Sequence, residues 1–143
     1  MPCANSIWIK QPLACFTAGD GNADGGLIVR DGRIAQLLGP GEKPTEPVEE
    51  TFDASDHVLI PGLINTHHHF YQTLTRALPC ALDKELFDWL KSLYPVWAGL
   101  TPDMLYSATQ IALAELLLSG CTTAADHHYL FPTGMEEAID IQV

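Results

Sequence analysis

The sequence predicts an α/β fold: the start of a (β/α)8 TIM-type barrel, preceded by part of a small β-sandwich domain. Two observations support this prediction. Short β-rich runs separated by turns fill residues 1–60, whereas strand and helix patterns alternate over residues 61–143. In addition, histidines follow each expected strand of the second part, at 67–69 and at 127–128. Parallel α/β barrels carry their active sites at the carboxyl ends of their strands.

The first part, residues 1–60, is expected to be all β, an N-terminal part of a composite β-sandwich. Asp31-Gly32 separates two β-rich runs, and such a pair is the strongest local signal for a tight hairpin. A loop rich in Pro, Gly and Glu spans 39–50, and Pro61-Gly62 marks the domain boundary. The expected strands are 7–9, 14–16, 27–30, 33–38, 51–53 and 57–60.

The second part, residues 61–143, is expected to hold the first β/α units of the barrel. Thr101 can cap a helix that has Pro102 in its first turn, and Gly120 is placed to stop that helix. The second half of this helix is apolar nearly all round, so we expect it to be buried. The expected strands are 63–66, which should be buried, and 121–126; the expected helices are 70–78, 83–93 (stopped before Pro95), 101–119 and one that begins at 135.

Two strands cannot close a barrel. The edge of the second strand would be bare and apolar, an arrangement that favours aggregation. The sequence is therefore interpreted as the front piece of a larger enzyme.

The amino-acid composition restricts the classes of molecule that the protein is expected to bind. The 143 residues carry a formal charge of −11, from 18 acidic and 7 basic side chains, which disfavours nucleic acid and membrane surfaces as partners. This charge does not exclude a small neutral or cationic molecule as the substrate. The four cysteines form no CxxC pair, so reduced thiols are expected. A secretory pattern of basic and then apolar residues is not seen at the start, and a cytoplasmic protein is expected.

His67 and His69 are the candidate metal ligands. Side chains alternate along an extended chain, so residues two apart share one side and lie roughly 6–7 Å apart. Imidazole is the commonest protein ligand for zinc-like ions, but a catalytic zinc needs at least three protein ligands. Further ligands must therefore come from elsewhere. His68 should face the other way and pack behind the site.

Other polar residues are weaker candidates. Gln72 offers an amide donor and acceptor to a flat heterocycle, and Tyr129 offers a ring face or a hydroxyl. The sequence does not decide between a structural and a pocket-lining role for Asp126, His127 and His128. Three aromatic residues are expected to be core rather than ligand contacts: Trp89, Tyr94 and Trp97.

These motifs resemble a known family. The run from Ile60 to Gln72 (IPGLINTHHHFYQ) is similar to the first metal motif of the amidohydrolase superfamily, and the run from Cys121 to Tyr129 resembles the second barrel strand of its deaminase and triazine-hydrolase branch. The resemblance implies that His67 and His69 bind one Zn²⁺ per active site, with Fe²⁺ as the alternative, and that Gln72 contacts substrate. It implies no catalytic residue in this chain, because the remaining ligands and the proton-shuttling glutamate come from later strands. The chain by itself is therefore expected to be inactive.

The resemblance also implies the reaction. Zinc would lower the pKa of bound water, and the resulting hydroxide would attack the amine-bearing carbon of a small planar heterocycle. The expected substrate is 8-oxoguanine, giving urate and ammonia, and the full-length enzyme is expected to be a homo-oligomer. A pterin, guanine or cytosine deaminase, a triazine hydrolase and a non-catalytic metal-binding module are the alternatives.

Overall fold

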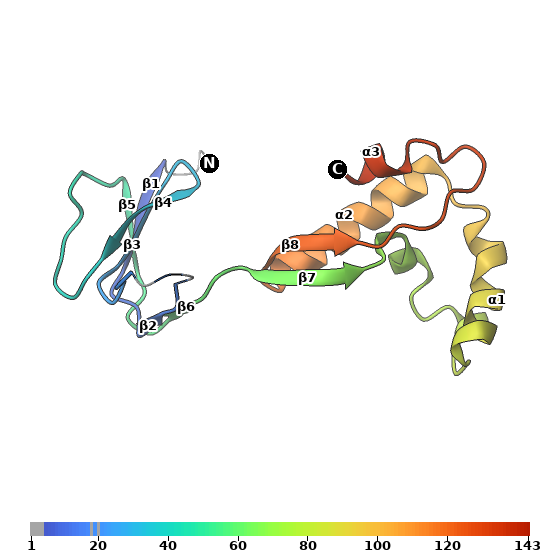
Figure 1. The fold of residues 1–143 in the computed structure, drawn as a ribbon, viewed down its shortest axis with the longest axis horizontal. Coiled ribbons are helices and arrows are strands. Elements are labelled where there is room, and N and C mark those ends of the chain that lie inside the picture. The colour runs from blue at the N-terminus through green and yellow to red at the C-terminus, as the bar shows by residue number, and fades with distance from the viewer. Residues whose placement is uncertain (1–4, 18, 20) are drawn as a thin grey trace. The chain divides into compact units, whose positions relative to one another are not determined.

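The computed structural model describes residues 5–17, 19 and 21–143. The chain divides between Pro61 and Gly62 into two compact units, each with its own β structure (Figure 1).

The first unit contains two small sheets. Its four-stranded sheet has the order β4-β3-β1-β5, with antiparallel β1–β3 and β3–β4 pairs and a parallel β1–β5 pair. A second sheet pairs β2 with β6 in parallel. All six expected strands are present: β1 (Ser6–Lys10), β2 (Ala14–Cys15), β3 (Gly26–Arg30), β4 (Arg33–Leu38), β5 (Glu50–Asp53) and β6 (Val58–Leu59).

The predicted hairpin lies between β3 and β4. Asp31 and Gly32 have φ angles of 49° and 73°. A two-residue type I′ turn requires positive φ at both central positions, and Asp-Gly tolerates this conformation well. The hairpin prediction is confirmed.

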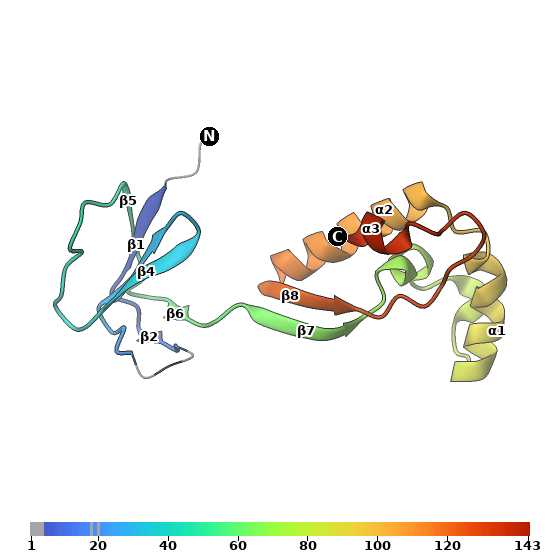
Figure 2. The same ribbon diagram turned by 45° about the horizontal axis from the view of Figure 1, so that its top comes forward.

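The second unit is built on a parallel pair of strands, β7 (Leu63–His68) and β8 (Cys121–Asp126). The crossover between them places helix α2 alongside β8 in both views (Figures 1 and 2). The helices of this unit are the 3₁₀ helices η1 (Phe70–Thr75) and η2 (Pro79–Ala81), and the α-helices α1 (Leu86–Trp97), α2 (Pro102–Leu118) and α3 (Ala138–Gln142).

Helix α2 begins and ends as predicted. The Thr101 hydroxyl accepts a hydrogen bond from the Met104 N–H at 3.3 Å, and Pro102 is the first helical residue. Gly120 follows the helix with φ +83°, a left-handed conformation that glycine adopts without a steric penalty.

The core of the second unit lies where the crossover helices meet the segment after β8. Tyr71, Leu93, Trp97 and Leu105 are fully or almost fully buried there. Trp89 packs against this cluster, so the prediction of two core tryptophans is confirmed. The prediction for Tyr94 is wrong, because its side chain is 45% exposed.

Three helix predictions need correction. The segment expected to be helical over 70–78 is a 3₁₀ helix that ends at Thr75. Helix α1 begins at Leu86 rather than 83 and runs through Pro95, because a proline in the last turn removes only one N–H while continuation of the helix buries Trp97. The last helix begins at Ala138 rather than 135.

The predicted burial of β7 and of the second half of α2 is also wrong. Ile64 is 67% exposed and Leu118 is 89% exposed, and Leu63, Ile111 and Leu117 are exposed too. The reason is that the second unit has a sheet of only two strands, which covers one side of α2. The described residues therefore contain mixed α/β structure with one parallel strand pair, not a closed barrel.

No helix among the described residues has the combination of length and apolar character needed to cross a membrane.

Candidate metal centre

The two histidine clusters meet at the carboxyl ends of β7 and β8. The strands run in parallel, and His68 lies opposite Asp126 in the register. One step further on, the His127 N–H donates to the His68 carbonyl at 2.7 Å. The predicted proximity of the two clusters is thereby confirmed.

His67 and His69 point toward each other. Their Nε2 atoms are 3.2 Å apart, and their ring planes are nearly perpendicular, at 89°. Two imidazole nitrogens bound to one tetrahedral zinc at about 2.0–2.1 Å would be about 3.3–3.4 Å apart. The separation therefore fits two ligands of a single ion.

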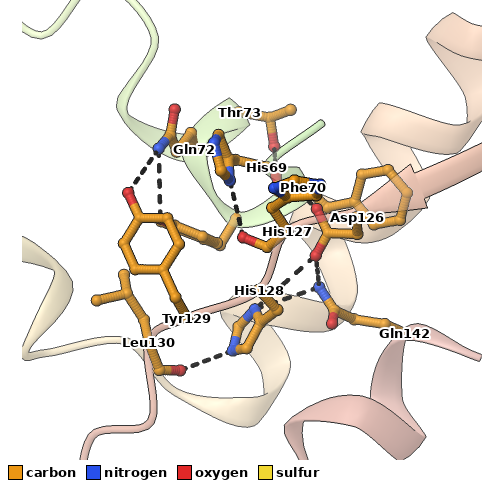
Figure 3. A network of polar contacts seen from close by, with 11 residues as sticks. His69, Phe70, Gln72, Thr73, Asp126, His127, His128, Tyr129, Leu130 and Gln142 are labelled. Atoms are coloured by element: carbon orange, nitrogen blue, oxygen red, sulfur yellow. Dashed lines mark hydrogen bonds and ion pairs between the residues drawn. The ribbon is translucent and has the colours of Figure 1, made fainter. Parts of the chain in front are cut away.

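The orientation of His69 is set by His127, the residue that follows β8. Its Nδ1 lies 2.8 Å from the carbonyl oxygen of His127 (Figure 3). A carbonyl can only accept, so Nδ1 carries the hydrogen and the lone pair is on Nε2, the atom that faces His67. Protein metal sites commonly fix a histidine ligand by such a bond from its second nitrogen.

His68 and His127 have different surroundings. His68 packs against Phe70, with ring centroids 5.0 Å apart, and its Nδ1 is buried without a hydrogen-bond partner among the described residues. The ring of His127 lies over that of His67 at 4.1 Å with a 42° tilt. His127 therefore contributes a carbonyl and a packing surface to the site.

The pair is an incomplete metal centre by itself. Within the described part of the chain, no group of three or more His, Cys, Asp or Glu side chains is arranged to hold an ion. Because a catalytic zinc takes at least three protein ligands, His67 and His69 can supply only part of such a site.

Gln72 and Tyr129 lie beside this pair. The Gln72 amide nitrogen is 3.4 Å from the Tyr129 hydroxyl and 3.3 Å from the Tyr71 hydroxyl. The ring of Tyr129 is 5.3 Å from that of His69, in an edge-to-face contact. A small pocket of about 240 Å³ adjoins His69 and Gln72; its lining residues are His68, His69, Gln72, Thr73, Thr75, Arg76 and Trp89.

Comparison with known proteins identifies the family. Residues 58–143 match the model of the amidohydrolase family. The chain belongs to this family.

Several relatives of this amidohydrolase chain are deaminases. It is 66% identical over 135 residues to 8-oxoguanine deaminase of Pseudomonas aeruginosa, covering 94% of this chain and 30% of that protein. It is 35% identical to an isoxanthopterin deaminase from an unknown prokaryotic organism, covering 91% of this chain and 28% of that protein. The chain thus spans about a third or less of the length of these relatives.

Solved structures of amidohydrolases support the same assignment. Atrazine chlorohydrolase from Arthrobacter aurescens in complex with zinc matches with a TM-score of 0.76 and 27% identity, over 95% of this chain and 32% of that one. A triazine hydrolase from the same organism matches with a TM-score of 0.77 and 27% identity, over 96% of this chain and 32% of that one.

The amidohydrolase site contains two residues that sequence reasoning missed. Tyr71 is fully buried, and burial raises the pKa of its hydroxyl, which keeps it protonated beside Gln72. Gln142 reaches back from α3 to the Asp126 carboxylate at 2.8 Å. Tyr71 could have been found from the sequence, because it lies two residues after the histidine triplet at 67–69. Gln142 could not, because its contact with Asp126 depends on how α3 packs.

Proposed function

We propose that this chain is the amino-terminal part of a zinc-dependent aminohydrolase that converts 8-oxoguanine and water to urate and ammonia. The observation that carries the proposal is the 3.2 Å separation of the His67 and His69 Nε2 atoms at the carboxyl end of β7, which pairs in parallel with β8. The choice of substrate is supported by the 66% identity to 8-oxoguanine deaminase over most of the chain.

In this proposal His67 and His69 hold one zinc ion per active site. When bound, zinc lowers the pKa of its water ligand toward neutrality and so supplies the nucleophile for hydrolysis. The His127 carbonyl keeps the lone pair of His69 Nε2 directed toward His67. Zinc is preferred to iron because a solved relative with the same architecture is a zinc complex.

Gln72 and Tyr129 would bind the planar heterocycle. Both reach the space beside His69, Gln72 from η1 and Tyr129 from the segment that follows β8. An amide can donate to and accept from the edge of a purine-like ring, while the phenol ring packs against it. The remaining metal ligands and the carboxylate that moves protons are assigned to the part of the protein that corresponds to the rest of its longer relatives.

A second substrate class has support of its own. Isoxanthopterin deaminase matches 91% of the chain at 35% identity, and a pterin is also a flat fused heterocycle with an amino group. The sequence identity to 8-oxoguanine deaminase is much higher, and for this reason we prefer a purine to a pterin as the proposed substrate.

The proposal is tested by measuring ammonia release by the whole protein. The whole protein here means the complete protein of which this chain is proposed to be the amino-terminal part. The zinc-loaded protein is assayed with 8-oxoguanine, guanine, isoxanthopterin, cytosine and a triazine. We expect kcat/KM to be highest for 8-oxoguanine, and a His67→Ala/His69→Ala variant to release no ammonia above background. A zinc-loaded protein that leaves 8-oxoguanine unchanged would falsify the substrate assignment. The 143-residue chain with zinc serves as a second control and should show no turnover.

A further inference from the structure

Asp126, the last residue of β8, carries a nearly buried carboxylate, with its side chain only 10% exposed. Its Oδ1 accepts a hydrogen bond from the Phe70 N–H at 2.7 Å, and its Oδ2 accepts one from the Gln142 amide at 2.8 Å (Figure 3). Burial of a carboxylate is unfavourable unless hydrogen bonds compensate it, so both contacts contribute to holding the group in this place.

The bond to Phe70 acts on the residue before it. The Phe70 N–H belongs to the peptide unit that follows His69, and His69 has φ −135° and ψ 87°, outside both the strand and the helix that it joins. The carbonyl of this peptide unit accepts the first hydrogen bond of η1, from the Gln72 N–H at 3.0 Å, whereas its N–H, at the first residue of the helix, has no partner within η1. The Asp126 carboxylate binds that N–H from the neighbouring strand.

Two further bonds, both made by His127 directly after β8, complete the restraint on His69. The His127 N–H holds the His68 carbonyl at 2.7 Å, and the His127 carbonyl holds His69 Nδ1 at 2.8 Å. His69 is thus tied through the peptide before it, through its own ring and through the peptide after it. Only the last of these three bonds uses a side chain of β8, that of Asp126.

A carboxylate suits this task better than an uncharged acceptor. A hydrogen bond to an ionised acceptor is roughly twice as strong as one between uncharged groups. The Gln142 amide lies between Asp126 Oδ2, at 2.8 Å, and His128 Nδ1, at 3.4 Å, while His128 Nε2 donates to the Leu130 carbonyl at 2.6 Å. This arrangement holds Oδ2 in place and leaves Oδ1 directed at Phe70.

From these contacts we infer that Asp126 is a positioning residue for the metal ligand His69. It acts through the Phe70 peptide and sets where the His69 ring enters the site. The inference deepens the proposed function and rests on it, because it takes His69 to be a zinc ligand.

The zinc affinity of the whole protein, measured by competition with a chelator, tests this role. Loss of a group that orients a metal ligand typically costs about 10–100-fold in metal affinity. We expect such a loss for Asp126→Ala, with recovery to within about threefold of wild type for Asp126→Asn, whose Oδ1 can still accept from Phe70. Gln142→Ala is the matched control: it removes the contacts to Asp126 Oδ2 and His128 Nδ1 but leaves the bond from the Phe70 N–H to Oδ1, and should also stay within about threefold.

The melting temperature of each metal-free variant separates positioning from folding. Wild-type zinc affinity in a folded Asp126→Ala variant would overturn the inference, as would an equal loss in Gln142→Ala. Should the alanine variant fail to fold, Asp126→Glu decides: it keeps the charge but displaces the carboxylate by one methylene, and wild-type affinity would again overturn the inference. A wild-type protein that binds no zinc would instead contradict the proposed function.

Discussion

The Nε2 atoms of His67 and His69 lie 3.2 Å apart, a spacing suited to two ligands of one tetrahedral ion. The chain reaches this spacing by ending β7 at His68, so that His67 is on the strand and His69 begins the turn into η1. The carbonyl of His127, directly after the neighbouring strand β8, then selects the tautomer of His69. The pair is therefore directed at a common point by contacts within the chain.

Replacement of either histidine should remove the metal. In the whole protein, His67→Ala or His69→Ala is expected to reduce zinc from about one ion per chain to less than about a tenth, because too few ligands remain. Elemental analysis after dialysis measures this. His57→Ala, a histidine of the first unit, is the control and should keep its zinc. Unchanged zinc in both ligand variants would contradict the assignment.

Gln72→Ala should weaken catalysis without loss of metal. One hydrogen bond of about 1.4 kcal/mol to the substrate corresponds to about a tenfold fall in kcat/KM. Steady-state kinetics and zinc content are measured together. The matched control is Gln110→Ala, because Gln110 is an exposed glutamine on α2 that bonds Tyr106 instead. Equal kinetics for the two variants would argue against a substrate contact at Gln72.

The Arg76–Glu115 pair should make a pH-dependent contribution to stability. Two hydrogen bonds of 2.8 and 2.9 Å join these exposed side chains, and the Arg76 guanidinium lowers the pKa of Glu115 below its usual 4.5. A group with a lowered pKa in the folded state stabilises above its unfolded pKa, and that stability is lost as pH falls through the lowered value.

Glu115→Gln should therefore lower the melting temperature slightly at pH 7, and the difference from wild type should vanish in acid, once Glu115 is protonated. Arg76→Gln should give the same fall, and the double variant no further fall, because both changes remove one interaction. Additive effects of the two substitutions would show that the pair is not coupled.

Gly62→Ala should destabilise the strand pair. A Cβ at Gly62 would lie 2.0 Å from Thr122 Oγ1 and 2.7 Å from Thr122 Cβ, so rotation of the threonine cannot relieve the clash. Such overpacking typically costs about 1–3 kcal/mol in the free energy of unfolding. Denaturant melts measure this loss.

A second substitution identifies the cause. Thr122→Gly removes the opposing side chain and should make Gly62→Ala less destabilising. Gly99→Ala is the matched control, because the nearest contact of its Cβ would be the Val96 carbonyl oxygen at 3.4 Å. A tolerated Gly62→Ala would show that β7 and β8 can separate locally.

Local signals predicted the elements that depend on a few neighbouring residues. Asp31-Gly32 specified a hairpin through its backbone preferences, and Thr101-Pro102 specified a helix start through a capping oxygen and a fixed φ. Both are interactions between residues close in sequence, so the sequence contains all of the information.

Predictions that depended on distant packing failed or stayed open. Pro95 was expected to end a helix, but burial of Trp97 continues α1 past it. The apolar second half of α2 was expected to be buried, yet a two-stranded sheet covers only one side. Asp126 could not be given a role, because its partners lie 56 and 16 residues away along the chain.

Local patterns were enough to predict the two-part α/β order, the placement of histidines after both strands of the second unit, and the shared side of His67 and His69, because strand alternation and turn chemistry depend on neighbouring residues. The nitrogen of His69 that faces His67, and the groups that hold its ring, became evident only from contacts between distant segments. Those properties come from hydrogen bonds to Asp126 and His127, at the end of β8 and more than fifty residues further along the chain. A pattern of residue types cannot specify such bonds until the strands are paired in register.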